Sequence, residues 1–233
     1  MVEQDAGVVG AEQRRHLQGV LLDMDGTLVD TEPYWFEAEK EAMRRLDGPW
    51  THADQHACVG GPLSKVADYM NQRAARPQPE ETVIGWVMDS MVRQVRAGLD
   101  PLPGVLPLLA NLSSEGVPTA LVSSSYRPLV DACVDVLGRR WFSATVAGDE
   151  LDSTKPHPEP YLRAAGLLGV DPRYCVAIED SPPGVASAEA AGCVVLVVPS
   201  VREIPEGPLR TVRSSLAGVN VGQLEDLVTL HRP

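Results

Sequence analysis

Three carboxylates stand within eight residues near the start of the chain, in the stretch GVLLDMDGTLVD at residues 19–30. Asp23 follows an apolar run, Asp25 comes two positions later, and Asp30 closes the group. The run is typical of a buried strand, and a carboxylate that leaves a buried strand is costly to desolvate unless a cation meets it. The spacing therefore predicts a cationic partner for Asp23 and Asp25, whereas Asp30 is better placed to cap a helix.

Other apolar runs of the chain also end in polar residues. In PTALVSSS the apolar run is followed by Ser123 and Ser124, and in VAIEDS it is followed by Glu179 and Asp180. Lys155 lies in the loop STKPHPEP. In open α/β sheets, ligands bind at the carboxyl ends of the strands. The recurrence of polar groups at this position predicts that the segments contribute to one shared site.

The elements that would hold these residues alternate along the chain. Apolar runs without polar alternation are typical of strands covered on both faces, and helical patterns follow them from residue 101 onward. This order favours an α/β fold with a doubly wound, mostly parallel sheet. The predicted strands lie in GVLLD, PTALVS, SATVAGD, YCVAIED and CVVLVVP, and the predicted helices between them in GVLPLLANLSSEG, RPLVDACVDVLG, PEPYLRAAGLLG and PPGVASAEAAG.

The segment after the first strand breaks this alternation. It carries three helical patterns and no convincing strand, which predicts a helical insertion whose first helix is capped by Asp30 or Thr31. The predicted domains are a flexible tail at residues 1–16, an α/β catalytic core at 17–30 and 101–233, and a helical cap domain at 31–100.

Charge and cysteine content narrow the partners and the compartment. The formal net charge is −12, which argues against nucleic acid or an anionic membrane surface as a partner. The four cysteines lie far apart and form no C-x-x-C pair, so we expect reduced thiols in a cytoplasmic protein. No run of residues is long and apolar enough to cross a membrane. We expect a monomer, with an oligomer left open.

The ordered set of motifs resembles the haloacid dehalogenase superfamily, in its capped subfamily I with β-phosphoglucomutase-like and phosphatase members. DMDGT at residues 23–27 resembles the first motif of that family, and Ser123 stands at the second. Lys155 in KPHPEPY stands at the third, and Glu179 with Asp180 in IEDSPPG stands at the fourth. The resemblance spans residues 19–198, and the four motifs together are far more specific than the first alone.

The resemblance implies a magnesium site. Asp23 would attack phosphorus and also bind Mg²⁺, the backbone carbonyl of Asp25 would be a second ligand, and Asp180 with Glu179 would complete the protein ligands. A phosphate monoester is a dianion, so a carboxylate nucleophile needs a cation to screen the repulsion, and Mg²⁺ prefers oxygen ligands. The expected intermediate is an aspartyl-phosphate on Asp23.

The resemblance also implies roles around the substrate. Asp25 would protonate the leaving oxygen and then take a proton from the attacking water. Ser123 and the amide of Ser124 would hold phosphoryl oxygens, and Lys155 would offset negative charge on Asp23 and on the phosphoryl group. The sequence leaves open whether Tyr34, Arg93 or Arg127 contacts the ligand.

Members of this superfamily use the same set of motifs for phosphatase, mutase and dehalogenase reactions. The predicted reaction therefore depends on the residues at a few particular positions. Asp25 argues against a dehalogenase, which needs no proton for its leaving group. Trp35 and Leu63 stand where β-phosphoglucomutase-like relatives carry a His and an Arg, and both departures favour hydrolysis over transfer. The predicted function is a Mg²⁺-dependent phosphatase for a small phosphorylated metabolite. A sugar-phosphate mutase and a non-catalytic module that binds phosphorylated metabolites are the alternatives.

Overall fold

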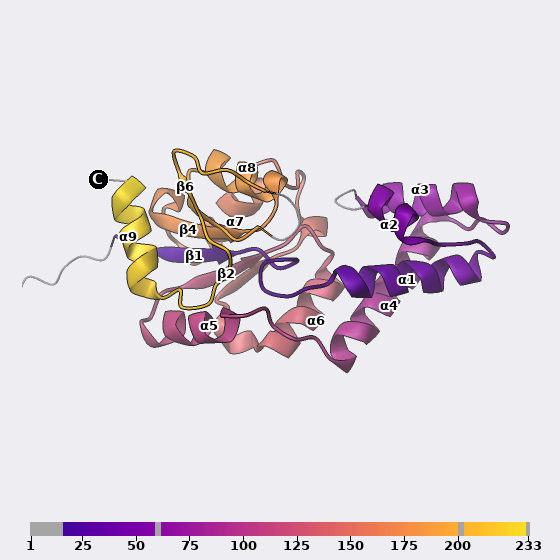
Figure 1. The fold of residues 1–233 in the computed structure, drawn as a ribbon, viewed down its shortest axis with the longest axis horizontal. Helices are drawn as coiled ribbons and strands as arrows, with labels where there is room; N and C mark the ends of the chain where they lie inside the picture. The colour runs from indigo at the N-terminus through magenta and orange to yellow at the C-terminus, as the bar shows by residue number, and fades with distance from the viewer. Residues whose placement is uncertain (1–15, 59–61, 200–202, 232–233) are drawn as a thin grey trace, which may run out of the picture.

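A six-stranded parallel sheet forms the centre of the protein, as seen in the computed structural model, which describes residues 16–58, 62–199 and 203–231 (Figure 1). Every pair of neighbouring strands runs parallel, in the order β3-β2-β1-β4-β5-β6. The predicted fold class is therefore confirmed. The strands are β1 (Gly19–Leu22), β2 (Thr119–Val122), β3 (Ala144–Val146), β4 (Cys175–Glu179), β5 (Val194–Val197) and β6 (Arg210–Val212).

Helices cover both faces of this sheet. Along β1, Val20 and Leu22 join one apolar cluster and Leu21 joins the other, because successive strand residues point to opposite faces. The first cluster contains residues of α5 (Val105–Ser114), α6 (Arg127–Leu137) and α9 (Val221–His231). The second contains residues of α7 (Glu159–Leu168) and α8 (Pro182–Ala190), which lie on the other side of the sheet in Figure 1.

The sequence patterns did not predict two elements, the edge strand β6 and the last helix α9. The strand β6 has only three residues, all of them half-buried at the sheet edge, and it includes the polar Arg210 and Thr211. The helix α9 follows a stretch that contains Pro and Gly and that is typical of a loop. Neither segment carries the continuous apolar run by which the inner strands were found.

In the described part of the chain, four helices lie between β1 and α5 in sequence, and Figure 1 shows them to the right of the sheet. The segment from residue 32 to 97 contains helices and no strand in its described part, in agreement with the helical patterns in the sequence. The proposed domain boundaries stay a prediction, and residues 1–15 of the predicted tail lie outside the described residues. The helices are α1 (Glu32–Arg45), α2 (His52–Cys58), α3 (Leu63–Arg73) and α4 (Glu80–Ala97).

The two segments that lead into and out of these helices run side by side. The Leu102 amide donates a hydrogen bond of 2.8 Å to the carbonyl of Leu28, and Val29 forms an antiparallel bridge with Pro101. The entry and the exit of the insertion are therefore joined to each other by paired backbone a few residues beyond Asp25. Among the described helices, none is long and apolar enough to span a lipid bilayer.

A buried acid on α1 contacts the loop that leads into α2. Glu39 is 4% exposed, and one of its oxygens accepts a hydrogen bond of 3.1 Å from the indole N–H of Trp50. Burial raises the pKa of Glu39 to about 7; the Trp50 hydrogen bond opposes the shift and the negative charge of Glu32 adds to it. In the folded protein, Glu39 therefore holds its proton until the pH approaches neutrality.

The free energy of unfolding should therefore fall as pH rises from about 4.5 to about 7, because the unfolded chain loses the Glu39 proton at lower pH than the folded chain does. The total decrease in the free energy of unfolding is roughly 3 kcal/mol. Glu39→Gln removes this titration and still offers an acceptor to Trp50. We expect the variant to gain stability on the wild type by up to about 3 kcal/mol between pH 5 and pH 8, measured by urea denaturation. Glu37→Gln, at an exposed position of the same helix, is the control. A stability difference independent of pH would contradict the assignment.

Candidate active site

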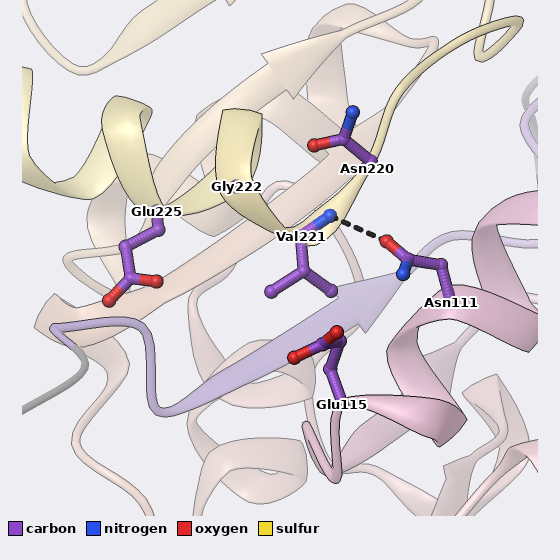
Figure 2. A pocket seen from close by; sticks show the side chains of 6 residues that line it. All are labelled: Asn111, Glu115, Asn220, Val221, Gly222 and Glu225. Atoms are coloured by element: carbon purple, nitrogen blue, oxygen red, sulfur yellow. Dashed lines mark hydrogen bonds between the residues drawn. The ribbon is translucent and has the colours of Figure 1, made fainter.

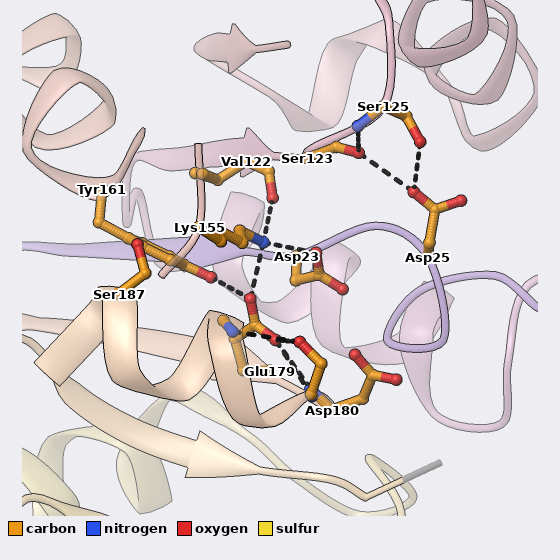
Figure 3. A network of polar contacts seen from close by, with 12 residues as sticks. Asp23, Asp25, Val122, Ser123, Ser125, Lys155, Tyr161, Glu179, Asp180 and Ser187 are labelled. Atoms are coloured by element: carbon orange, nitrogen blue, oxygen red, sulfur yellow. Dashed lines mark hydrogen bonds and ion pairs between the residues drawn. The ribbon is translucent and has the colours of Figure 1, made fainter. Parts of the chain in front are cut away.

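The strand register brings the predicted polar residues to one edge of the sheet. The strand β1 pairs with β2 on one side and with β4 on the other, so the residues that follow these three strands are neighbours. Asp23 follows β1, Ser123 follows β2, and Asp180 follows β4, whose last residue is Glu179. Figure 3 shows that their side chains lie close together with that of Lys155.

Three carboxylates form a compact acidic cluster. Asp23, Glu179 and Asp180 each offer an oxygen, and these oxygens lie within 4.8 Å of one another. All three residues are buried, and Oδ2 of Asp23 has no hydrogen-bond partner among the described residues. Burial raises the pKa of Asp23 well above its usual range, and the negative charge of Glu179 adds to the shift. A buried carboxylate oxygen beside two further carboxylates fits a divalent cation, which prefers such ligands.

Lys155 supplies the positive charge of the cluster. Its ammonium nitrogen lies 2.7 Å from Oδ1 of Asp23 and 2.6 Å from Oε1 of Glu179, and it also donates to the carbonyl of Val122 at 3.0 Å. Burial alone would lower the pKa of Lys155, but its attraction to both carboxylates raises the pKa. The lysine is therefore a fixed cation beside Asp23.

Hydroxyl groups hold Asp25. Its Oδ1 accepts a hydrogen bond of 2.6 Å from Thr31, and its Oδ2 accepts from Ser123 at 3.1 Å and from Ser125 at 2.9 Å. The carboxylate points toward the serine loop in Figure 3, away from the acidic cluster. Ser124 lies between these two serines in the same loop.

Thr31 does not cap α1 with its side chain, in contrast to one of the two alternatives from the sequence. The Asp30 carboxylate instead accepts a hydrogen bond of 3.2 Å from the Glu32 amide, and the Thr31 hydroxyl is used by Asp25. The roles of Thr31 and Ser125 beside Asp25 were missed, because hydroxyl residues are common in turns and nothing in their spacing indicates a tertiary partner.

The three residues that the sequence left open are engaged elsewhere. Arg127 forms an ion pair with Glu150, its shortest contact being 2.6 Å, and Arg93 donates to Glu41 at 2.8 Å. The Tyr34 hydroxyl donates to the carbonyl of Gly98 at 2.7 Å, near the exit of the helical insertion. These contacts give each side chain a structural role.

Two pockets lie outside this network. One of about 460 Å³ lies between α5 and α9 and is lined in part by Asn111, Glu115 and Glu225 (Figure 2). Its Asn111 accepts a hydrogen bond of 2.8 Å from the Val221 amide at the start of α9. The other, of about 1050 Å³, is a groove between α4 and α6. Neither is lined by a member of the acidic cluster.

The fold and the site place the protein in a class of α/β proteins with a doubly wound sheet, an inserted group of helices, and carboxylates with a lysine at the carboxyl ends of the strands. Comparison with known families narrows this class. The chain belongs to the haloacid dehalogenase-like hydrolases, whose family pattern matches residues 17–192. The family predicted from the sequence is thus confirmed.

Individual relatives agree with this assignment. Hexitol phosphatase B of Escherichia coli (strain K12) is 32% identical over 217 residues, which cover 91% of this chain and 95% of that protein. Phosphoglycolate phosphatase of Yersinia pseudotuberculosis is 30% identical over 185 residues, which cover 76% of this chain and 78% of that protein. The crystal structure of CbbY from Rhodobacter sphaeroides in complex with phosphate superposes with a TM-score of 0.80 at 25% identity, covering 90% of this chain and 99% of that one.

The environment of Glu179 yields a prediction about Gly184. A Cβ atom at Gly184 would lie 1.9 Å from the Glu179 carboxylate, so Gly184→Ala must displace that carboxylate. We expect metal affinity and turnover to fall about tenfold or more, as is usual when a group that orients a metal site is lost. Gly166→Ala, at another helical glycine with open space around it, is the matched control and should change neither. Calorimetric titration with Mg²⁺ measures the effect, and equal affinities in the two variants would contradict the prediction.

Proposed function

We propose that the protein is a Mg²⁺-dependent phosphatase that hydrolyses a small phosphorylated metabolite through an aspartyl-phosphate on Asp23. The observation that carries the proposal is the environment of the Asp23 carboxylate. One of its oxygens contacts Lys155 at 2.7 Å, and the other is buried with no hydrogen-bond partner in the described part of the chain. This asymmetry suits a nucleophile that also binds a cation.

The residues divide the reaction between them. Asp23, the backbone carbonyl of Asp25, and Asp180 with Glu179 would hold Mg²⁺, which would neutralise charge on the phosphoryl oxygens. An Asp23 oxygen would form a bond to phosphorus while the bond from phosphorus to the ester oxygen breaks.

The second half of the reaction restores Asp23. In our proposal Asp25 gives a proton to the leaving oxygen, then takes one from the water that attacks phosphorus and releases Asp23. Ser123 and the Ser124 amide would hold phosphoryl oxygens, and Lys155 would balance the charge that builds up there. The helices between residues 31 and 100 would act as a cap that excludes bulk water during both steps.

The relatives indicate the substrate class. Because the Escherichia coli relative is named as a hexitol phosphatase, we propose a sugar-alcohol or sugar phosphate as the substrate. A phosphorylated acid is the second candidate, from the name of the phosphoglycolate phosphatase. We also propose that the protein acts as a cytoplasmic monomer and not on nucleic acid, in line with its net charge of −12 and its free cysteines.

The Asp23→Asn variant tests the chemistry. We expect the Mg²⁺-dependent release of phosphate from p-nitrophenyl phosphate to fall roughly a thousandfold or more, because the amide is a poor nucleophile and a weaker cation ligand. Asp30→Asn is the control, because the Asp30 side chain accepts a hydrogen bond from the Glu32 amide and asparagine keeps that acceptor. Turnover that survives in Asp23→Asn, or that is unchanged after removal of Mg²⁺ with a chelator, would disprove the proposal.

A second assay separates hydrolysis from transfer. The protein is given a sugar 1-phosphate with a trace of sugar bisphosphate, and the sugar 6-phosphate and inorganic phosphate are both measured. A phosphatase releases inorganic phosphate, whereas isomer that accumulates without it would favour the mutase. A panel of hexitol phosphates, sugar phosphates and phosphoglycolate, ranked by kcat/KM, then identifies the substrate class.

A further inference from the structure

We propose that the hydroxyl of Tyr161 is a positioning group for the metal centre, which holds the Glu179 carboxylate turned toward Lys155. The inference rests on the proposed metal site and adds a residue that does not itself contact metal or substrate. Tyr161 lies in the first turn of α7, six positions after Lys155, and its side chain is completely buried.

Tyr161 contacts both members of the central ion pair. Its hydroxyl donates a hydrogen bond of 2.7 Å to Oε1 of Glu179, and the ammonium of Lys155 lies 5.2 Å from the centre of its ring. Figure 3 shows the ring beside Lys155 with its hydroxyl directed at Glu179. A single rigid side chain thus fixes the distance between the α7 helix and the two charged groups.

The remaining surroundings of Tyr161 are apolar. It belongs to the cluster formed by one face of the sheet with α7 and α8, which includes Leu21, Val146 and Ala164. Glu179 is the polar partner that satisfies the hydroxyl. A phenol carries its proton at neutral pH, so the hydroxyl is the donor in this hydrogen bond.

Hydrogen-bond donors surround the Glu179 carboxylate on both of its oxygens. Its Oε1 accepts from Tyr161 and from Lys155, and its Oε2 accepts from the Asp180 amide at 3.1 Å and from the Ser181 amide and hydroxyl at 3.3 and 3.1 Å. Five hydrogen bonds thus converge on a carboxylate that has about four lone-pair positions. They fix the orientation of the carboxylate that would bind Mg²⁺ together with Asp180, and the Tyr161 hydroxyl is one of the donors that keep it in place.

Tyr161→Phe removes the hydroxyl and keeps the ring. We expect the affinity for Mg²⁺, measured by calorimetry without substrate, to fall about tenfold or more, and kcat for p-nitrophenyl phosphate to fall by a similar factor with little change in KM. Tyr174→Phe is the matched control, because this half-buried tyrosine directly precedes β4 and so lies at the opposite end of that strand from Glu179. The control should resemble the wild type in both measurements.

A double variant tests whether Tyr161 acts through Glu179. In the Glu179→Ala background, Tyr161→Phe should cause almost no additional loss of Mg²⁺ affinity, because the acceptor that the hydroxyl positions is already gone. Losses that multiply in the double variant would overturn the proposal, as would a Tyr161→Phe protein with the wild-type affinity and kcat.

Two further measurements separate the possible failures. p-Aminophenylalanine at position 161 restores a donor on the same ring and should recover Mg²⁺ affinity. The role of the donor is therefore still tested if Tyr161→Phe fails to fold, and no recovery would overturn the proposal.

A wild-type protein that binds Mg²⁺ but hydrolyses no phosphate ester would disprove the proposed function, and the calorimetric comparison would still decide the role of Tyr161. A wild type that binds no Mg²⁺ would overturn both.

Discussion

The ion pair between Lys155 and the carboxylates of Asp23 and Glu179 is the interaction on which the site depends. Each of these charges is buried, and a buried charge without a partner would be strongly destabilising. Asp180 adds a third carboxylate, and one oxygen from each of the three lies within 4.8 Å of the others. A buried group of three carboxylates supplies the oxygen ligands that a divalent cation prefers.

The topology of the sheet explains why this cluster forms where it does. From β1 the chain moves through β2 to β3 on one side, and it then returns to β4 on the other side of β1. The crossovers therefore leave in opposite directions from β1 and β4, and ligands of open α/β sheets bind at such a switch point. Asp23 and Asp180 leave the sheet at this point, and the loop with Lys155 brings its ammonium to them.

Much of this arrangement could be predicted from the sequence, because it depends on local patterns. The apolar runs before Asp23, Ser123 and Glu179 identify buried parallel strands, and parallel strands bring their carboxyl ends together without further information. The contacts that were missed depend on side-chain direction after folding. Thr31 and Ser125 are ordinary turn residues in the sequence, and Tyr161 has the position of a core aromatic residue; only the packed structure shows that its hydroxyl meets Glu179.

The helical insertion is mechanically connected to the site through Asp25. Thr31, which directly precedes α1, donates to one oxygen of Asp25, and the two serines of the β2 loop donate to the other. Asp25 is thus held between the sheet and the first helix of the insertion. The backbone pairing of Leu28 with Leu102 joins the segments that enter and leave the insertion close to this contact. Asp25, the residue proposed to transfer the proton, therefore takes hydrogen bonds both from the segment that leads into α1 and from the loop after β2.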